Sequence, residues 1–281
     1  MLDLNSEQSL ERSPELPIGA PPLTAEQAIA NLRHDDLSLR YYAAWWLGKH
    51  QVTDTRAVGA LIEALEDDSD RTEFGGYPLR RNAARALGKL ADTRAVPGLI
   101  GGLDCDDFYV REAAAQSLGM LGDSAAIPPL MRLLDGGVEA AQFVPGRPHL
   151  AQPYEAVIEA LGALGATEAV DRIRPFVDHF VTRVQYAATR AMYQLTQDPM
   201  YGDRLVAALN GSDVQLRRTA LSDLGAIGYA PAAEAIAAAA TENSFKLFAL
   251  KGLLEHQLRA VPTQALSLRA IEMMDLMDNL L

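Results

Sequence analysis

RRNAARALGKLADTRAVPGLIGGLD, residues 80–104, is the stretch that decides the fold. In its first half, Ala83, Ala84 and Leu87 fall on one side of a helix, and the small residues there let a neighbouring helix approach closely. In its second half, apolar residues return at helical spacing after Asp92. The stretch therefore predicts a pair of helices joined by a short turn.

The turn between these two helices carries signals for a helix end and a helix start. Gly88 follows the last apolar turn, so we expect it to cap the first helix in the left-handed conformation. Asp92 or Thr93 fits the N-cap of the second helix, and Pro97 falls in its first turn, where a missing N–H group costs little.

The first helix of this pair recurs six times along the chain. Its closing residues stand at positions 48, 88, 119, 162, 193 and 225, so the successive steps are 40, 31, 43, 31 and 32. A period of roughly 31 residues is typical of a helical-pair solenoid. We therefore predict an all-α fold, a right-handed α-α superhelix of the HEAT-like or armadillo type with about six to seven repeats. Such a fold offers a long concave face for function.

The spacing also divides the chain into parts. Two steps exceed the basic period, by 9 and 12, and we assign the extra length to insertions near 67–81 and 135–155. Both precede the same helix of their repeats, so we expect them at one edge of the array, where insertions often serve binding; tolerated surface loops are the alternative. The other parts are a flexible arm at 1–22, a single solenoid over 23–281, and a helix near 264–281 that caps the array or binds a partner.

Charge and cysteine content argue against several classes of partner and site. The 281 residues carry 25 Lys and Arg against 37 Asp and Glu, and this net charge of −12 counts against a nucleic-acid partner. The single cysteine, Cys105, allows neither an intramolecular disulfide nor a Cys-based metal site, which indicates a reducing, cytoplasmic compartment. No apolar stretch reaches the roughly 18 residues of a membrane span, so we expect no integral membrane contact.

No familiar catalytic motif accounts for an activity. The five histidines lack the spacing of a metal site, and neither a phosphate-binding loop nor a GxSxG motif is present. Cys105 lies among acidic residues in LDCDDFYVRE, which makes it a poor candidate for a nucleophile. The sequence predicts no metal site.

One helix departs from its sister repeats. Seven and three residues before each closing residue lie two positions that share a helix face, and most repeats hold charged or polar residues there. The first repeat instead holds Tyr41 and Trp45. We expect these two rings to form an exposed stacking platform for a flat ligand. Tyr42 and Trp46 either join the platform or pack under the N-terminal region.

Arginines near this platform favour a ligand with carboxylates. Four arginines stand eight residues before a closing residue: Arg40, Arg80, Arg111 and Arg217. The favoured interpretation is a structural ladder, in which each pairs with a repeated Asp of the neighbouring loop, and ligand binding is the alternative. Arg81 holds one of the polar-face positions and is the better ligand candidate. Because a guanidinium group can take a carboxylate by two parallel hydrogen bonds, the platform suits a flat, conjugated, carboxylate-bearing ligand.

The repeat resembles a known family. Its pattern R-x-x-AA-x-x-LG…D-x-RAVP-x-L is similar to the HEAT-like repeats of the phycobilisome lyase family over roughly residues 27–255. The blocks RYYAAWWLGKH at 40–50 and EFGGYPLRRNAARALGKLADTRAVP at 73–97 resemble, more specifically, the E-type subunits of heterodimeric phycocyanobilin lyases. The repeat alone is less specific, since it also occurs in proteins with no lyase role.

The resemblance implies an enzyme that works as one half of a heterodimer in the cytoplasm of a phycobilisome-containing phototroph. With an F-type lyase subunit, such a chain attaches phycocyanobilin through a thioether to a cysteine of the apo-phycocyanin α subunit. The bilin is then a substrate, with no cofactor implied, and the acceptor supplies the nucleophile. Two alternatives stay open: a non-catalytic bilin chaperone or phycobilisome scaffold, and a lyase for another bilin or acceptor, such as phycoerythrocyanin or phycoerythrin α subunits.

The resemblance transfers no catalytic residue, so the candidate site comes from residue chemistry. Glu112 is the candidate catalytic residue, because a carboxyl group can hydrogen-bond the pyrrole N–H groups or donate a proton to the bilin. Aromatic rings would hold the bilin, and Arg81, with Arg80 or Arg147, would meet its propionates. The candidate substrate-binding residues are Tyr41, Trp45, Tyr77, Arg80, Arg81 and Arg147.

Overall fold

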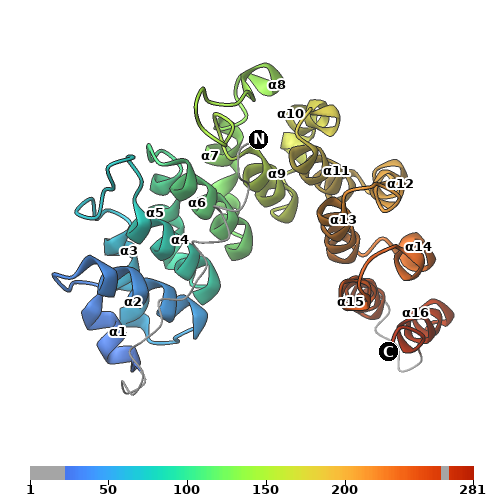
Figure 1. Ribbon diagram of the computed structural model, residues 1–281, viewed down its shortest axis with the longest axis horizontal. Helices are drawn as coiled ribbons and strands as arrows, with labels where there is room; N and C mark the ends of the chain where they lie inside the picture. The colour runs from blue at the N-terminus through green and yellow to red at the C-terminus, as the bar shows by residue number, and fades with distance from the viewer. Residues whose placement is uncertain (1–22, 261–265) are drawn as a thin grey trace.

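The chain folds into an arch of paired helices (Figure 1). The computed structural model describes residues 23–260 and 266–281, and within them the one β feature is an isolated bridge between Phe143 and Leu150. Seven successive helix pairs and a last single helix fill this described part of the chain, so the predicted all-α solenoid is confirmed. The predicted arm at residues 1–22 lies outside the described residues.

Each pair contributes one helix to an inner row, which lines the concave side of the arch, and one to an outer row (Figure 1). The inner row consists of α2 (Leu37–Lys49), α4 (Pro78–Leu90), α6 (Phe108–Leu121), α9 (Tyr154–Ala163), α11 (Thr182–Thr196), α13 (Val214–Ile227) and α15 (Asn243–Ala260). The outer row consists of α1 (Ala25–Asn31), α3 (Thr55–Ala64), α5 (Val96–Gly102), α7 (Ile127–Arg132), α10 (Val170–Ile173), α12 (Pro199–Ala208), α14 (Ala233–Ala238) and α16 (Leu268–Asp278). Short 3-10 turns accompany several outer helices: η3 (Thr93–Ala95), η4 (Ser124–Ala126), η5 (Thr167–Ala169), η6 (Arg174–Asp178) and η7 (Ala230–Ala232).

The closing glycines let neighbouring inner helices touch. A Cβ atom added to Gly48 would lie 2.7 Å from Ala86 Cα, and one added to Gly119 would lie 2.9 Å from Ala160 Cα. Both distances are shorter than real Cβ contacts, so these positions need glycine for the close approach of two backbones. Each inner helix therefore packs directly on the next, and together they form the wall of the concave face.

The expected role of Gly88 as a helix cap is wrong. Helix α4 continues past it, and Ala91 takes the left-handed conformation at the helix end, with φ 55°. Gly88 instead packs under α6, where an added Cβ would lie 2.5 Å from Ser117 Oγ. The expected start of the next element is confirmed, because Asp92 caps η3 by accepting a hydrogen bond from the Arg94 N–H at 2.9 Å.

The two insertions flank the N-terminal end of α6. The first is the segment between α3 and α4, and its Tyr77 N–H donates to Asp107 Oδ2 at 2.7 Å. The second lies between α7 and α9 and contains the short helix α8 (Gly137–Ala140); its Ala151 carbonyl accepts a hydrogen bond from Arg111 Nη2 at 3.1 Å. Since Asp107 is the N-cap of α6 and Arg111 lies in its first turn, both insertions lie at the same edge of the arch.

One seam of the inner row, between α11 and α13, differs from the others. The closing residue of α11 is Tyr193, and the repeat register places Asp223 of α13 opposite it. The buried apolar residues divide here into two clusters, one ending at Tyr201 and the other starting at Leu205. Tyr193 packs against both clusters, and its ring meets that of Tyr229 edge-on at 5.2 Å.

The last helix, α16, packs against α14 and α15 at the end of the array. Its Met273 is fully buried, whereas Leu268, Ile271 and Met274 are exposed. The helix therefore covers the last outer and inner helices and still presents apolar side chains to its surroundings.

Candidate functional site

A line of side chains crosses the concave face from one inner helix to the next. We call it the concave stripe; it occupies the positions seven and three residues before each closing residue. Its members are Tyr41, Trp45, Arg81, Arg85, Glu112, Gln116, Glu155, Glu159, Tyr186, Arg190, Arg218 and Ser222. Most of these side chains are partly buried, because the curvature of the arch draws neighbouring inner helices together. The stripe runs from aromatic residues on α2, through arginines on α4, to carboxylates on α6 and α9.

The aromatic end of the stripe differs in detail from the expected platform. Trp45 stacks on Tyr42, with ring centroids 5.4 Å apart, and Lys49 Nζ lies 4.5 Å over the Trp45 ring. Tyr41 and Trp45 are partly buried rather than fully exposed. Trp46 turns to the core and contacts the His50 ring at 4.3 Å. Trp45 therefore stacks on Tyr42 and not on Tyr41, with which the sequence paired it.

Arg81 lies next along the stripe and keeps its hydrogen-bonding capacity. Its guanidinium carbon lies 4.8 Å over the ring of Tyr109, which places a cation on an aromatic face. Its Nε atom is buried and, within the described part of the chain, has no hydrogen-bond partner. Because Arg81 as a whole is only partly buried, its terminal nitrogens rather than the covered Nε can donate to a carboxylate on a ligand.

The arginines eight residues before the closing residues bind the backbone. Their acceptors are the carbonyl oxygens of Leu32 for Arg40, Glu66 and Asp67 for Arg80, Cys105, Asp106 and Ala151 for Arg111, and Gly211 and Ala240 for Arg217. Arg40 also forms an ion pair with the Asp67 carboxylate. Most of these carbonyls belong to the turns that follow the outer helices, so these arginines do form a structural ladder. The expected pairing with a repeated Asp holds for Arg40 alone, and the other three bind backbone carbonyls instead.

Carboxylates gather at the middle of the stripe. Burial raises the pKa of the Glu155 carboxyl to about 7, and the negative charges of Glu159 and Glu112 act in the same direction. Burial also raises the pKa of Glu159, although the charge of Arg190 opposes that shift. A carboxyl group that titrates near neutral pH can both donate and accept a proton under working conditions. The centre of the arch can therefore supply protons to a bound ligand.

A buried ion pair continues this cluster across the seam between α11 and α13. Asp223 is 3% exposed, and Arg190 Nη1 lies 3.2 Å from its Oδ1 atom. The same nitrogen lies 3.7 Å from Glu159 Oε1. Burial raises the pKa of Asp223 to about 7 in spite of Arg190, and the charge of Glu159 adds to the shift. Arg190 is therefore the shared cation of two carboxylates, Glu159 on α9 and Asp223 on α13.

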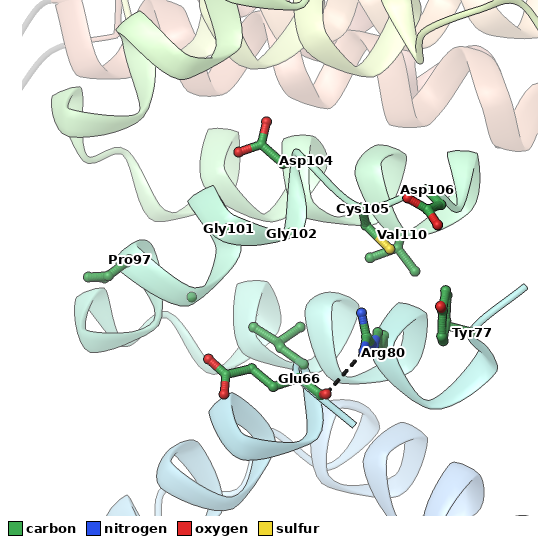
Figure 2. A pocket seen from close by; sticks show the side chains of 12 residues that line it. Glu66, Tyr77, Arg80, Pro97, Gly101, Gly102, Asp104, Cys105, Asp106 and Val110 are labelled. Carbon is green, nitrogen blue, oxygen red and sulfur yellow. Dashed lines mark hydrogen bonds between the residues drawn. The ribbon is translucent and has the colours of Figure 1, made fainter. Parts of the chain in front are cut away.

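Two other predicted residues, Tyr77 and Arg80, line a pocket of about 440 Å³ at the edge of the arch (Figure 2). Figure 2 shows them at one end with Cys105, while Pro97 lies at the opposite end. The Arg80 guanidinium carbon lies 4.3 Å over the Tyr77 ring, and Arg80 Nη2 donates to the carbonyl of Glu66 at 3.0 Å. The walls come largely from the ends of the outer helices α3 and α5, so this pocket is separate from the concave stripe.

The predicted residues thus divide into groups. Tyr41, Trp45, Arg81 and Glu112 lie along the concave stripe, where Glu112 acts on the titration of Glu155. Arg147 lies apart, exposed in a turn of the second insertion where its N–H donates to the Val144 carbonyl at 2.9 Å. In the same insertion, the ring of His149 stacks on Phe108 of α6 at 4.2 Å.

Known proteins match this chain along nearly its whole length. It is 66% identical to the phycocyanobilin lyase subunit alpha of Nostoc sp. (strain PCC 7120), over 93% of this chain and 95% of that protein. It is 56% identical to the protein of the same name from Synechocystis sp. (strain PCC 6803), over 93% and 97%. The chain belongs to the phycocyanobilin lyase alpha-subunit family. A further member of the wider group, the bilin biosynthesis protein PecE of the same Nostoc strain, is 48% identical over 85% of this chain and 89% of that protein.

The fold of this lyase alpha-subunit family is known from a solved structure. A chain in the complex of CpcE and CpcF of phycocyanin lyase from Nostoc sp. PCC7120 superimposes with a TM-score of 0.88 at 66% identity, covering 95% of this chain and 98% of that chain. The PBS lyase HEAT-like repeat model matches residues 39–67 and 153–179, and a HEAT repeat model matches residues 77–141. The matched segments include the aromatic helix α2 and the carboxylate helix α9.

The described residues, 23–260 and 266–281, carry neither a membrane span nor a metal cluster. No helix there is long and apolar enough to cross a membrane. In the same residues, no group of three or more His, Cys, Asp or Glu side chains has an arrangement that could hold a metal ion.

No motif of the sequence analysis pointed to the residues around Arg190. Asp223 lies two residues before the closing residue of α13, a position at which other repeats have small residues such as Ala86, Ser117 and Ala160. A carboxylate in a small-residue position is the signal that could have identified it. The closing residue Tyr193, in place of glycine, is a second signal at the same seam.

Proposed function

We propose that this chain is the alpha subunit of a lyase that attaches phycocyanobilin to a cysteine of the phycocyanin α subunit, together with an F-type partner. The observation that carries the proposal is the 66% identity, over 93% of the chain, to a phycocyanobilin lyase subunit alpha. The match to a chain of the CpcE–CpcF complex supports the partner. The reaction belongs in the cytoplasm, because the acceptor thiol must stay reduced until the bilin is attached.

The reaction is an addition and needs no oxidant or reductant. The sulfur of the acceptor cysteine bonds to the CH carbon of the ethylidene group, which is the exocyclic carbon of the double bond to ring A. The carbon–carbon double bond becomes single, and the thiol hydrogen ends on the ring carbon, so no group leaves. The lyase therefore has to bind the bilin, orient it toward the thiol, and move one proton. Positioning and general acid–base chemistry can supply this kind of rate gain.

The concave stripe offers the groups that these tasks require. Trp45 and its neighbouring rings stack on the conjugated bilin, and the partly exposed Arg81 takes a propionate. Glu112 and Glu155 face the pyrrole nitrogens. Because burial raises the pKa of Glu155 to about 7, its carboxyl group can protonate a bilin nitrogen and make the ethylidene group more electrophilic.

Three further predicted contacts lie outside the stripe, at the edge that carries the insertions. Arg80 and Tyr77 line the edge pocket, and Arg147 is exposed on the second insertion. We keep these residues as predicted substrate contacts at the rim of the arch. Their substitution should change the rate of ligation less than a change to Arg81 or Glu112, which lie on the stripe itself.

The test is co-expression of the chain with an F-type subunit, phycocyanobilin and each apo-phycobiliprotein α subunit in turn. We expect a covalent adduct on the phycocyanin α subunit, visible by zinc-induced fluorescence on a denaturing gel and absent when either lyase subunit is omitted. The adduct on other α subunits should be weaker. A bilin that binds but never becomes covalent in the presence of an active partner would point to a chaperone or scaffold and contradict the proposal.

A second candidate, a lyase for another bilin, draws on the 48% identity to PecE. The higher identity to the phycocyanobilin lyase subunits, 66% and 56% in the two relatives compared, favours phycocyanobilin. The colour of the adduct formed in the same co-expression separates the two candidate lyases. A lyase that also isomerises the bilin to a form with fewer conjugated double bonds gives an adduct that absorbs at a shorter wavelength.

A further inference from the structure

Arg190 makes both of its ionic contacts through a single nitrogen atom of its guanidinium group. Its Nη1 atom lies 3.2 Å from Asp223 Oδ1 and 3.7 Å from Glu159 Oε1, so both ionic contacts run through one nitrogen. The Nε atom is buried, and among the described residues neither Nε nor Nη2 has a hydrogen-bond partner. The edge formed by Nε and Nη2 can donate two parallel hydrogen bonds to a planar carboxylate and is unpaired.

This unpaired edge distinguishes Arg190 from the arginines of the structural ladder. Arg111 and Arg217 also have a buried Nε atom without a partner in the described part of the chain. Both, however, use their two terminal nitrogens on backbone carbonyls, with Arg217 Nη1 at 2.5 Å from the Gly211 carbonyl and Nη2 at 2.9 Å from the Ala240 carbonyl. Arg190 is held from one side by carboxylates. On its other side Nη2 has no partner among the described residues, and the buried Nε can donate to a ligand once the side chain turns toward the pocket.

Arg190 also lines a pocket of about 390 Å³ on the concave face, between α11, α13 and α15. Lys251 and Arg259 of α15 line the same pocket, in which Glu255 is the one carboxylate. Glu255 is already paired, with Lys251 Nζ at 3.8 Å and Arg259 Nη2 at 3.6 Å. The lining of the pocket therefore contains three cations and one carboxylate. Asp223 and Glu159, the carboxylates that offset the charge of Arg190, are not part of that lining.

The shape of this pocket admits a ligand with an apolar part. Phe248 belongs to its lining and is 66% exposed, so its ring is accessible to a ligand in the pocket. A Cβ atom added to Gly252 would lie 2.6 Å from the Gly225 carbonyl oxygen, so α13 and α15 touch beneath the pocket. The small side chains of Ser222 and Ala226 leave the space above that contact open.

We propose that this pocket is a carboxylate-binding subsite, in which the Nε–Nη2 edge of Arg190 takes the carboxylate and Phe248 packs against the carbon skeleton that bears it. Asp223 and Glu159 hold the guanidinium group from the opposite side. Two sources offer this chemistry: a propionate of the bilin, and an Asp or Glu side chain of a bound polypeptide. The subsite goes beyond the proposed function, because it does not depend on the placement of a propionate at Arg81.

Two variants of the full chain isolate the subsite. Arg190→Lys keeps a positive charge beside Asp223 and removes the two-donor edge. Ala226→Leu fills the pocket from an exposed position and leaves all charges unchanged. The matched control is Arg94→Lys, which changes an exposed arginine that pairs with Asp92 of its own turn on the outer row. Thermal unfolding of each variant checks that the fold is kept.

Each variant is titrated with three probes. The first two are phycocyanobilin and its dimethyl ester, added to the heterodimer with the F-type subunit and followed by bilin absorbance. The third kind of probe is a polypeptide. The F-type subunit and apo-phycocyanin α are titrated separately against the full chain, and these two titrations form the polypeptide arm of the experiment. Losing one bidentate, charge-assisted pair should weaken binding about tenfold. Arg94→Lys should bind all probes as the wild type does.

The pattern of losses decides the source of the carboxylate. If both variants weaken binding of the free bilin and neither changes binding of the ester, the subsite takes a propionate. If both weaken a polypeptide and leave the bilin unchanged, it takes an acidic side chain. Wild-type affinity for every probe, or an effect of only one of the two variants, overturns the subsite. Should the wild-type heterodimer bind no bilin at all, the proposed function fails, and the polypeptide arm still decides the subsite.

Discussion

The seams between inner helices are built in two ways. From α2 to α11, and again between α13 and α15, a closing glycine meets a small residue, and a Cβ atom at Gly162 would lie 3.0 Å from Ala191 Cα. Between α11 and α13, Tyr193 takes the place of glycine and Asp223 the place of the small residue. Backbone contact holds the first kind of seam. Ring packing between Tyr193 and Tyr229 and the buried contact of Asp223 with Arg190 form the second.

The two kinds of seam respond to different variables. A glycine seam depends on shape alone, so its stability should change little with pH. The polar seam contains a carboxyl group that is buried beside one shared cation, so its contribution to stability depends on protonation. The apolar core also divides at this seam, which makes it the weakest point for cooperation between the two halves of the arch. We therefore expect a change of pH to alter the stability of the seam between α11 and α13, and added side-chain volume to destabilise the glycine seams.

The largest effect should come from the polar seam. Burial raises the pKa of Asp223 from 3.8 to about 7, so the folded protein binds a proton more tightly than the unfolded chain. This contribution to stability is complete below pH 4 and is lost as the pH rises through 7. Asp223→Asn removes it, so the loss of unfolding free energy between pH 5 and pH 8 should be smaller in the variant by about 3 kcal/mol. Urea unfolding at the two pH values measures the difference.

A matched control for this prediction lies on an exposed turn of the outer row. Asp178→Asn removes a carboxylate that pairs with Arg204 at 2.6 Å, and its pH dependence of stability should follow the wild type. An Asp223→Asn variant that loses as much stability between pH 5 and pH 8 as the wild type would show that the polar seam does not titrate in this range.

Bulk at a glycine seam should have the next largest effect. Gly119→Ala places a Cβ atom 2.9 Å from Ala160 Cα, so α6 and α9 must separate, and we expect a loss of about 2 kcal/mol. Gly59 of α3 has no atom within 4 Å of an added Cβ, and Gly59→Ala should instead gain up to about 1 kcal/mol from helix propensity. Urea unfolding at a single pH measures both variants, and we expect the two changes in the free energy of unfolding to have opposite signs. A stabilising Gly119→Ala would show that the seam is not close-packed.

Much of this fold could be predicted from the sequence, because the repeat is dictated by local packing. The regular spacing of the closing residues and the apolar face around Ala83 and Leu87 predict the stacked pairs. The role of Gly88 was mistaken, since a glycine after an apolar turn fits both a helix cap and a close contact. Only the position of Ser117 on the neighbouring helix distinguishes the two.

The candidate site was less predictable, because its chemistry depends on contacts across helices. The sequence predicted that the positions of Arg81 and Glu112 lie on one polar face of their helices, and these positions belong to the concave stripe. The pKa of Glu155 follows from its burial and from the charges of residues on its own and neighbouring helices, which no single repeat reveals. The unpaired edge of Arg190 depends likewise on which of its nitrogens Asp223 occupies.

The smallest expected effect tests whether the stripe serves ligand binding, whereas the seams serve stability. Trp45→Ala removes a ring that stacks on Tyr42 at 5.4 Å and is partly buried on the concave face. Loss of one stacking contact should weaken phycocyanobilin binding about tenfold, or about 1.4 kcal/mol, while the fold is kept. The measurement is an absorbance titration of the heterodimer with the bilin. Phe74→Ala, which removes an 82% exposed ring on the first insertion, is the control and should bind as the wild type does. Unchanged bilin absorbance and ligation in Trp45→Ala would remove the aromatic end of the stripe from the binding site and move the bilin toward the carboxylates of α9.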